Sequence, residues 1–596
     1  MKLVRLKITD PNGFRSLPCG FEHCFRTEWT MQEELISPDG FAPFVCAGPN
    51  GSGKSNLLEA LAAIFFQLEV LRVRRSFLPE ALQGEALNFS PVAFELDYLI
   101  RVPAEYRGPD SPEWANVGVL KNTGESVRLF WNNQSNFDAG VPEILAGNLA
   151  DMLLPQYVLG YSSGENEILS LPFFKMRFVQ FDEYWNALTK QLSYPGHPET
   201  RLVYLDSGFS QAILLCNLLF QDEATLQAFR EDVGIGALKE FRIILRRSIA
   251  LEPEQLQDFA SEDESQRQSP EEIVKSNPAL SAETDEMGVT HYRLNLIQLL
   301  EGGDKSSLMV SALKRCATIS YVDEATDTLT LDYWVNEATK EAFRENFDNS
   351  PLALFQAFQV LLMLNLYAVI PAIKEDLYQS TSHYVNETVP VLASDQRIMR
   401  FKFVRFTKQC LAEPIMLKQL SDGEHQLLHS LGLCLLFRNT NSLFLLDEPE
   451  THFNPDWRAN FISRLRQCLP GTGEFAQEML ITTHTPYLIS DSKPDKVLVF
   501  EKDKASGAVS ITHPDYNTLG ASINKITMSP IFGKRETIGG YAQARLENFH
   551  ARFEQGADVG SLIDDIQREL GDSVEKILLI QSIMDEAKRE KGEGQN

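Results

Sequence analysis

A glycine-rich segment in the first 60 residues has the residue types and spacing that hold a phosphate group. Residues 48–55 read GPNGSGKS and fit the pattern G-x-x-x-x-G-K-[ST]. Glycines let the backbone wrap an anion closely, so that N–H groups and the N-terminus of the following helix face the phosphates. In such a loop Lys54 neutralises the β and γ phosphates of a nucleotide, and the Ser55 hydroxyl ligates Mg²⁺. The predicted nucleotide-binding residues are Gly48, Pro49, Asn50, Gly51, Ser52, Gly53, Lys54, Ser55 and Asn56.

Two further segments place polar residues directly after apolar runs. The glycine-rich loop alone would also fit a kinase, a helicase or a plain turn, so these segments are needed to choose among them. SLFLLDEPE, residues 442–450, is expected to be a buried strand that delivers Asp447 and Glu448 to its C-terminal end. There Asp447 would hold Mg²⁺ through water, and Glu448 would polarise the attacking water. LITTHTP, residues 480–486, places His484 after another strand, where an imidazole can sense or orient the γ phosphate.

Another segment, LSDGEHQ at residues 420–426, opens an apolar helix just before the acidic strand. Ser421 and Gly423 suit a helix N-terminus that offers a hydroxyl and backbone N–H groups to an anion. Asp422 and Glu424 fall in the first turn of this helix. An ordinary helix cap is the alternative interpretation. The four residues Ser421, Asp422, Gly423 and Glu424 are therefore candidate nucleotide contacts whose meaning depends on the other segments.

Strands and helices at defined places are expected to position these residues. FAPFVCAG, residues 41–48, is an apolar run ending in glycine, as a buried strand does before a phosphate loop, and residues 55–71 have helical spacing. PVAFELDYLI, residues 91–100, is expected to be a strand of the same sheet. DKVLVFEKD and AVSITH, residues 495–513, are expected to form a hairpin that closes the lobe.

The composition limits the size, the partners and the compartment. The chain has 596 residues, too many for one simple core, and 43% of them are hydrophobic, as in globular proteins. Its net charge of −27 opposes bulk attraction to nucleic acid, so any such contact must be local or supplied by a partner. The eight scattered cysteines indicate a reducing compartment. Because no segment is expected to reach the ~18 uncharged apolar residues of a membrane span, we expect a cytoplasmic location and no membrane contact.

The order of phosphate loop, LSDGE, LLDEPE and strand-terminal histidine resembles the ABC-type ATPase head of the RecF, SMC and OLD-nuclease superfamily. The resemblance implies that the chain binds ATP and Mg²⁺. It implies catalytic roles for Lys54, Glu448 and His484, and metal binding by Ser55 and Asp447.

The same resemblance implies an oligomer. In such heads residues like 421–424 of one subunit cap the ATP on the phosphate loop of another, which gives a homodimer or higher homo-oligomer with sandwiched nucleotides. THFNP, residues 451–455, is expected to be the D-loop region, with His452 near the dimer interface. The glutamine of the Q-loop is not identifiable from the sequence; Gln67 and Gln83 are the candidates.

The predicted fold class is α/β: an ABC-type P-loop ATPase head with a mostly helical insertion and a helical C-terminal segment. The head is expected to comprise residues 1–170, with the phosphate loop, and 397–515, with the other motifs. Residues 171–396 are the insertion and residues 516–596 the helical C-terminal region. The insertion shows no heptads sustained over three or more repeats, which excludes the long coiled coil of SMC proteins and favours single-chain defence and OLD-type ATPases.

The full-length arrangement is similar to restriction-system-associated ATPases such as the PtuA subunits of Septu and retron antiphage systems. Those proteins act with a separate HNH nuclease, PtuB, and in retrons with a reverse transcriptase and its msDNA. One alternative is an OLD-type ATP-dependent nuclease, for which the segment after the histidine motif offers Glu501 and Asp503 but no glycine-linked acidic cluster or DxD pair. The other alternative is a RecF-like DNA-repair ATPase.

Local basic runs are candidate nucleic-acid contacts, although solvated faces are the commoner explanation. The runs interleave cations with aromatic residues, as nucleic-acid grooves often do. They comprise Arg72, Arg74 and Arg75, then Arg397, Arg400, Lys402, Arg405 and Lys408, and a third run at residues 229–247.

Overall fold

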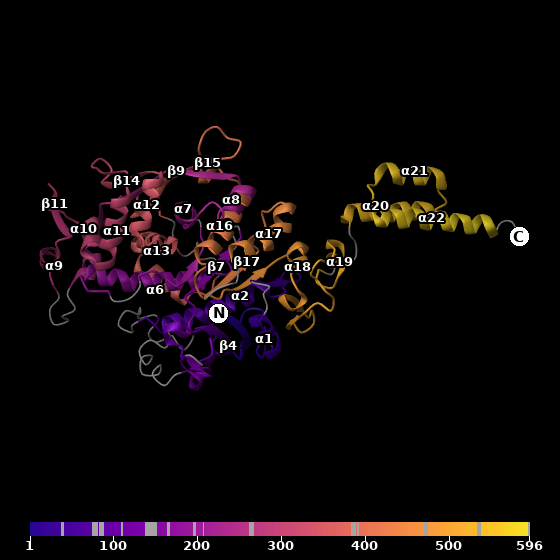
Figure 1. Cartoon of the computed structure of the whole chain (residues 1–596), viewed down its shortest axis with the longest axis horizontal. Coiled ribbons are helices and arrows are strands. Elements are labelled where there is room, and N and C mark those ends of the chain that lie inside the picture. The colour runs from indigo at the N-terminus through magenta and orange to yellow at the C-terminus, as the bar shows by residue number, and fades with distance from the viewer. Residues whose placement is uncertain are drawn as a thin grey trace. The chain divides into compact units, whose positions relative to one another are not determined.

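The computed structural model shows two compact units, Met1–Leu519 and Gly520–Asn596 (Figure 1). It describes the chain outside residues 37–40, 74–81, 83–88, 109–110, 138–151, 164–166, 195–197, 207, 261–267, 383–384, 386–388, 390–391, 470–474, 533–537 and 594–596.

A seven-stranded sheet forms the centre of the first unit. Its order is β20-β19-β3-β18-β17-β7-β8, and all neighbouring strands are parallel except the antiparallel pair β19 and β20. The strands are β3 (Phe44–Ala47), β7 (Tyr157–Ser162), β8 (Leu202–Tyr204), β17 (Ser442–Asp447), β18 (Glu478–Thr482), β19 (Val497–Lys502) and β20 (Val509–Thr512). Every residue of β3, β17 and β18 is buried, as expected for parallel strands covered on both faces. The predicted strands and the closing hairpin are thus present.

Helices pack around this sheet and set the positions of the motifs. They are α2 (Lys54–Val70), α6 (Ser170–Thr189), α7 (Ser210–Phe220), α16 (Asp422–Leu436), α17 (Pro455–Cys468) and α18 (Pro486–Ser490). Helix α2 contacts β17, β18, β7 and α6, whereas α16 packs against α7 and α17 (Figure 1). The helices α2 and α16, which follow the glycine loop and LSDGE, therefore have different neighbours.

A second, antiparallel sheet has the order β2-β1-β4-β5-β6. Its strands are β1 (Lys2–Ile8), β2 (Glu22–Cys24), β4 (Phe94–Arg101), β5 (Trp114–Lys121) and β6 (Arg128–Trp131), and α1 (Glu28–Ile36) follows β2. The prediction that residues 91–100 share the sheet of the phosphate loop is therefore wrong. The physical reason is visible in β4, where buried and half-buried residues alternate, which is the pattern of an antiparallel strand with one covered face.

Residues 171–396 contain more strand than the sequence indicated. Strands β9 (Ile235–Arg246), β13 (Ile319–Asp323) and β14 (Thr328–Trp334) join β15 (Met399–Lys408) and β16 (Ile415–Met416) in an antiparallel sheet, and β10 (Ser248–Leu251), β11 (Leu280–Thr284) and β12 (Thr290–Asn295) form another. Helices of this region are α8 (Gln227–Asp232), α9 (Pro270–Ser276), α10 (Leu296–Gly302), α11 (Asp304–Cys316), α12 (Glu337–Asn346), α13 (Pro351–Met363) and α14 (Pro371–Gln379). The insertion is thus a mixed region in which helices and two small sheets pack together.

One described helical stretch, Pro351–Ala368, is long and apolar enough to cross a membrane by length and composition alone. It contains amides but no charged residue, so a strict count of apolar residues, as used for the prediction above, misses it. Half of the stretch is buried within the fold, and Leu354, Phe355 and Phe358 of α13 are inaccessible to solvent. Helix α13 packs against α7 and β15, so it has the contacts of a core helix.

The second unit is helical, as predicted for the C-terminal segment. It contains α19 (Ile523–Met528), α20 (Gly540–Glu554), α21 (Val559–Glu569) and α22 (Val574–Glu593). Helices α20, α21 and α22 contact one another (Figure 1). Phe549, Leu562, Ile566 and Ile583 form their small core.

Candidate nucleotide-binding site

The glycine loop connects β3 to α2 and has the backbone geometry of an anion cradle. Gly48 and Gly53 have φ angles of 146° and 102°, which side-chain-bearing residues rarely adopt. A Cβ at Gly48 would lie 2.5 Å from the Phe500 carbonyl oxygen, so the loop has no room for one there. Gly53 precedes α2 and has no side chain to cap it, so the first N–H groups of α2 are available to an anion.

Lys54 lies inside this loop. Its ammonium donates hydrogen bonds to the carbonyl oxygens of Gly48 (3.1 Å) and Pro49 (3.0 Å). Burial lowers the pKa of Lys54, and the nearby carboxylates of Glu448 and Asp447 oppose that shift. The Lys54 amine is therefore a buried basic group that lies close to both the loop and the acidic strand.

Ser55 and Asp447 meet at the end of β17. The Ser55 hydroxyl donates to Asp447 Oδ1 over 2.6 Å, and the Thr482 hydroxyl donates to the same oxygen over 2.7 Å. Asp447 and Thr482 are paired in the register of the parallel strands β17 and β18, which explains why the two side chains meet. Burial raises the pKa of Asp447, so a cation at this point would stabilise the ionised carboxylate.

The donor set fits Mg²⁺. This ion takes oxygen ligands, usually one or two from the protein, and completes its shell with phosphates and water. Ser55 and Asp447 supply such oxygens within hydrogen-bond distance of each other. Among the described residues no group of three or more His, Cys, Asp or Glu side chains could hold a metal without such help. Bound there, Mg²⁺ would neutralise phosphate charge, held by Ser55 directly and by Asp447 through water.

Glu448 follows Asp447 and occupies a strained turn. Its φ angle of 49° is left-handed, which costs energy for a residue with a side chain and is common at functional sites. The turn is held because the Glu448 N–H donates to Thr482 Oγ1 (3.0 Å) and to the Thr482 carbonyl (3.2 Å). His484 Nε2 lies 3.2 Å from Glu448 Oε1, and this hydrogen bond is the main reason that the pKa of Glu448 is lowered. An ionised Glu448 beside an imidazole can accept a proton from water.

Sequence reasoning missed several residues that support the acidic pair. Thr482 contacts both acids, as described above. The Thr451 hydroxyl donates to the Glu448 carbonyl (2.9 Å) and lies 3.4 Å from its Oε2, and Ser163 Oγ lies 3.1 Å from Thr451 Oγ1. In the sequence, only the position of Thr482 at the end of a predicted strand next to the acidic strand could have indicated its role. Ser163 lies in no recognisable motif.

Glu450 is a further buried acid of the same loop. Its side chain accepts a short hydrogen bond from the Thr483 hydroxyl, and its Oε2 lies buried without a hydrogen-bond partner among the residues that the structure describes. Burial raises the pKa of Glu450 from 4.5 to about 7. Glu450 thus holds a proton to a higher pH than an exposed glutamate does.

The LSDGE segment lies at the N-terminus of α16, as predicted. Ser421 caps this helix and forms a reciprocal capping box with Glu424, and Glu424 also forms an ion pair with Lys408 of β15. Ser421 and Asp422 are exposed, whereas Gly423 is buried. Within the described part of the chain, the side chains of Ser421 and Glu424 form hydrogen bonds with each other's residues and with Lys408, and none reaches the phosphate loop. The structure therefore brings together Lys54, Ser55, Asp447, Glu448 and His484, and leaves residues 421–424 apart from them.

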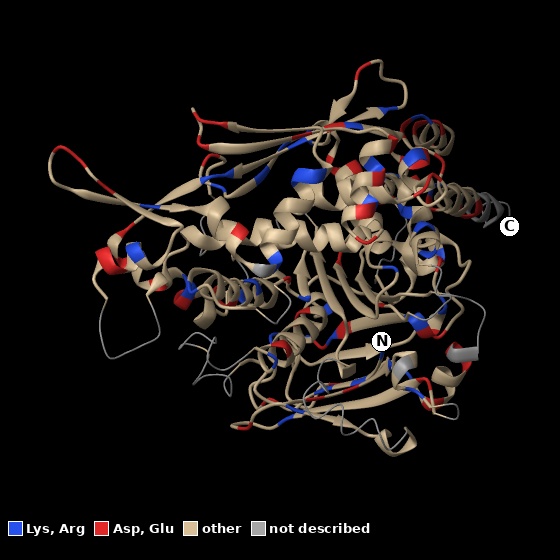
Figure 2. Ribbon diagram, turned by 60° about the vertical axis from the view of Figure 1, so that its left-hand side comes forward, with Lys and Arg blue, Asp and Glu red and all other residues tan. Residues whose placement is uncertain are grey.

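The second and third basic runs come together on neighbouring strands, where several of their cations form ion pairs. β9 carries the third run and pairs with β15, which carries the second. Arg242 forms a two-pronged ion pair with Asp332, Arg405 pairs with Glu240 at 2.6 Å, and Lys408 pairs with Glu424. Charges of both signs lie along these strands (Figure 2). The surface is thus mixed in sign; Arg74 and Arg75 lie outside the described residues.

The two Q-loop candidates do not support that role. Gln83 lies outside the described residues. Gln67 is thirteen residues after Lys54 in α2, about 20 Å along the helix. Its side chain accepts from Lys121 (2.6 Å) and donates to the carbonyls of Phe89 and Pro91. Gln67 therefore joins α2 to the antiparallel sheet.

Glu501 and Asp503, the candidate nuclease acids, do not form a metal site in the described residues. Asp503 accepts hydrogen bonds from the N–H groups of Ala505 and Ser506 and from the Ser506 hydroxyl, so it holds its own turn. Glu501 is exposed on β19. Neither residue belongs to a metal-binding cluster in the described chain.

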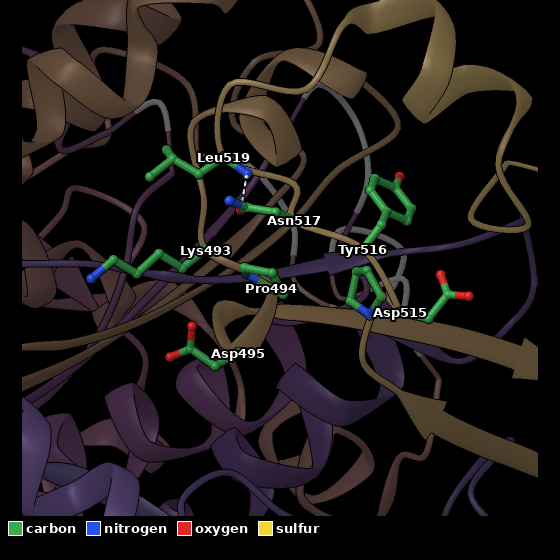
Figure 3. Close-up of a pocket in the computed structure, with 8 residues that line it drawn as sticks. Lys493, Pro494, Asp495, Asp515, Tyr516, Asn517 and Leu519 are labelled. Atoms are coloured by element: carbon green, nitrogen blue, oxygen red, sulfur yellow. Dashed lines mark hydrogen bonds between the residues drawn. The ribbon is translucent and has the colours of Figure 1, made fainter.

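An open pocket lies at the other end of the central sheet. It is lined by Lys493, Pro494, Asp495, Pro514, Asp515, Tyr516, Asn517 and Leu519 (Figure 3). Residues 493–495 precede β19, whose first residue is level with Val45 of the parallel strand β3, so the pocket lies at the amino ends of the strands. Figure 3 shows the carboxylates of Asp495 and Asp515 pointing in different directions. This pocket is therefore separate from the candidate site.

Comparisons with known proteins found one matching family model and several similar solved structures. Residues 320–490 match the family model described as "AAA domain, putative AbiEii toxin, Type IV TA system"; this range includes LSDGE, the acidic strand and His484. Two solved structures are similar. One is the Smc head domain with an extended coiled coil bound to the C-terminal domain of ScpA from Pyrococcus furiosus, at 12% identity and TM-score 0.30, covering 86% of this chain and 96% of that one. The other is the SmcHead bound to the C-winged helix domain of ScpA, at 10% identity and TM-score 0.31, covering 86% and 97%. No curated protein matches the chain.

The match to an AAA domain over residues 320–490 and the geometry of the loop and acidic strand support an α/β protein with a nucleotide-binding site.

Proposed function

We propose that the chain binds and hydrolyses ATP with Mg²⁺ at the carboxyl ends of β3, β17 and β18. One observation carries the proposal: adjacent strands bring a buried lysine, a hydroxyl–carboxylate pair and a glutamate–histidine pair to one edge of the sheet. Ligands bind at that edge in open α/β sheets.

Each residue has a distinct role in this proposal. Lys54 and the N–H groups of residues 48–56 hold the β and γ phosphates. Ser55 and Asp447 hold Mg²⁺, which neutralises charge as it develops on the phosphates. Glu448 accepts a proton from the attacking water, and His484 keeps Glu448 ionised and contacts the γ phosphate.

The arrangement of LSDGE favours a site shared between copies. Ser421 and Asp422 are exposed at the N-terminus of α16, where backbone N–H groups attract anions. In the described part of the chain, their hydrogen bonds do not reach the phosphate loop of their own chain. Two copies placed head to tail would bring this helix end to the nucleotide of the partner, so we propose a homodimer or higher homo-oligomer with two sandwiched ATP molecules.

We further propose that this ATPase is the sensor or regulatory subunit of an antiphage defence complex, controlling a separate HNH nuclease. The resemblance to PtuA-like proteins supports this role, and so does the matched family, whose description names a toxin of a toxin–antitoxin system. A nuclease on another chain is also supported because neither Glu501 nor Asp503 belongs to a metal-binding cluster among the described residues. In a retron, a reverse transcriptase and its msDNA would be additional partners.

The test compares wild type with Glu448→Gln in the native complex. ATP hydrolysis, release of the partner and DNA cleavage are measured with ATP and Mg²⁺. Loss of hydrolysis together with changed release or cleavage supports the proposal, and identical behaviour contradicts it.

Two tests on the chain alone address the alternatives. The chain is incubated with plasmid and Mg²⁺ or Mn²⁺; cleavage that is lost in Glu501→Gln or Asp503→Asn indicates an OLD-type nuclease. Salt-sensitive DNA binding with DNA-stimulated hydrolysis by the chain alone indicates a RecF-like ATPase.

A further inference from the structure

The start of the LSDGE helix is in close contact with the loop that follows Glu448 in the same chain. Gly423 is buried against this loop, and a Cβ there would lie 2.7 Å from the His452 carbonyl oxygen. A side chain at position 423 would therefore push the helix away from the loop. This contact explains why glycine is needed within the first turn of α16.

Gln426 lies one turn further along the same face of α16, since residues three apart in a helix are neighbours. Its side chain is only 3% exposed. Its Oε1 accepts a hydrogen bond from the His452 N–H over 3.0 Å, and its Nε2 lies 3.5 Å from the Glu448 carbonyl oxygen. The Gln426 side chain also limits the rise that burial causes in the pKa of Tyr161 of β7. One amide thus joins α16 to both ends of the turn that holds Glu448.

The loop itself is braced, so that displacement at one end reaches the other. The Thr451 N–H and hydroxyl both bond to the Glu448 carbonyl, at 3.2 and 2.9 Å. Arg458 of α17 donates to the carbonyls of Thr451 (2.8 Å) and Glu450 (3.3 Å). Because Glu448 is held in a left-handed conformation within this turn, its position depends on every one of these bonds.

We propose that Gln426 is a positioning residue that makes hydrolysis at one nucleotide site depend on occupancy of the other. This inference rests on the shared sites proposed above. ATP held by the partner pulls on the N-terminus of α16 through Ser421, and Gly423 and Gln426 transmit that displacement to Glu448 of their own chain. Glu448 serves the ATP on its own phosphate loop, so the two sites hydrolyse in a coupled manner.

A mixed dimer tests the coupling. In a purified heterodimer of wild type and Lys54→Ala, the wild-type phosphate loop is complete and meets an intact LSDGE segment of the partner. The LSDGE segment of the wild-type chain, however, faces a phosphate loop that cannot hold ATP. We expect this complete site to hydrolyse at least about five-fold more slowly than a site in the wild-type dimer, the lower end of usual allosteric coupling. Equal rates per complete site overturn the inference.

Variants of Gln426 test the residue itself. Gln426→Met keeps the volume and removes the hydrogen bonds, and Gln426→Glu keeps the acceptor for the His452 N–H. We expect Gln426→Met to lower kcat at least about five-fold and reduce the Hill coefficient to one, with ATP affinity unchanged, and Gln426→Glu to recover part of the rate. Gln467→Met, on an exposed face of α17, is the matched control.

The outcomes separate this inference from the proposed function. If wild type neither hydrolyses ATP nor associates with ATP, the shared-site proposal itself fails. If wild type does both and Gln426→Met keeps the wild-type rate and Hill coefficient, only the role of Gln426 fails. A loss of ATP affinity in Gln426→Met equal to the loss of rate indicates a purely structural role and also overturns the inference.

Discussion

Glu450 provides a pH-dependent test of the electrostatics beneath the candidate site. Its pKa is about 7 in the folded chain and near 4.5 when the group is exposed. Between these values the folded protein keeps a proton that the unfolded chain has lost. Stability therefore falls as the pH rises through this window, and the loss levels off above the folded pKa. At ~1.4 kcal/mol per pKa unit, the full difference corresponds to about 3 kcal/mol.

The substitution Glu450→Gln removes the titration and keeps an oxygen for the Thr483 hydroxyl. The free energy of unfolding of both proteins is measured by urea denaturation from pH 5 to pH 8. We expect Glu450→Gln to gain about 2 to 3 kcal/mol relative to wild type across that range. Glu413→Gln removes an exposed carboxylate and controls for the loss of a negative charge. Parallel profiles for wild type and Glu450→Gln would refute the reasoning.

Further predictions concern stability, metal binding and nucleotide binding. Arg26 and Glu478 form a buried pair at 2.5 Å, each with 1% of its side chain exposed, so Arg26→Met should cost about 3 to 5 kcal/mol in urea unfolding, and Arg26→Met with Glu478→Gln should recover most of it. Thr482→Val removes the hydroxyl that supports Asp447. It should raise the Mg²⁺ concentration needed for half-maximal hydrolysis roughly 10- to 100-fold in a metal titration. An unchanged titration contradicts the assigned contact. Lys54→Ala should abolish ATP binding measured by calorimetry. Its change in unfolding temperature should be no larger than that of the exposed-lysine control Lys402→Ala.

Local patterns in the sequence were sufficient for the parts of the site that lie within single segments. The loop at residues 48–55 and the acid-tipped strand combine a short apolar run with polar residues at fixed spacing, and neighbouring residues fix their own backbone. The structure brings Lys54, Asp447 and His484 to one edge of the sheet because β3, β18 and β17 are adjacent and parallel.

Contacts between distant segments were not predictable in this way. Thr482 meets Asp447 because of the register between two parallel strands, which no local pattern encodes. Gln426 reaches the loop after Glu448 only once α16 is packed in place. The same limit explains β4, whose sheet was assigned wrongly, because a strand's own residues do not specify its neighbour. In β9 buried and half-buried residues alternate from Phe241 to Arg246, which is the pattern of a strand, whereas the residue types alone predict only a basic run there.

The shared nucleotide site is the central claim, and an intermolecular cross-link tests it most directly. A photo-crosslinking residue replaces the exposed Asp422 in the Glu448→Gln background, which is expected to retain ATP. We predict ATP-dependent cross-links from position 422 of one copy to residues 48–56 of another, which mass spectrometry of isotopically mixed chains identifies, and their loss in Lys54→Ala. Cross-links that ignore ATP, or that never reach the phosphate loop of another copy, would contradict the claim.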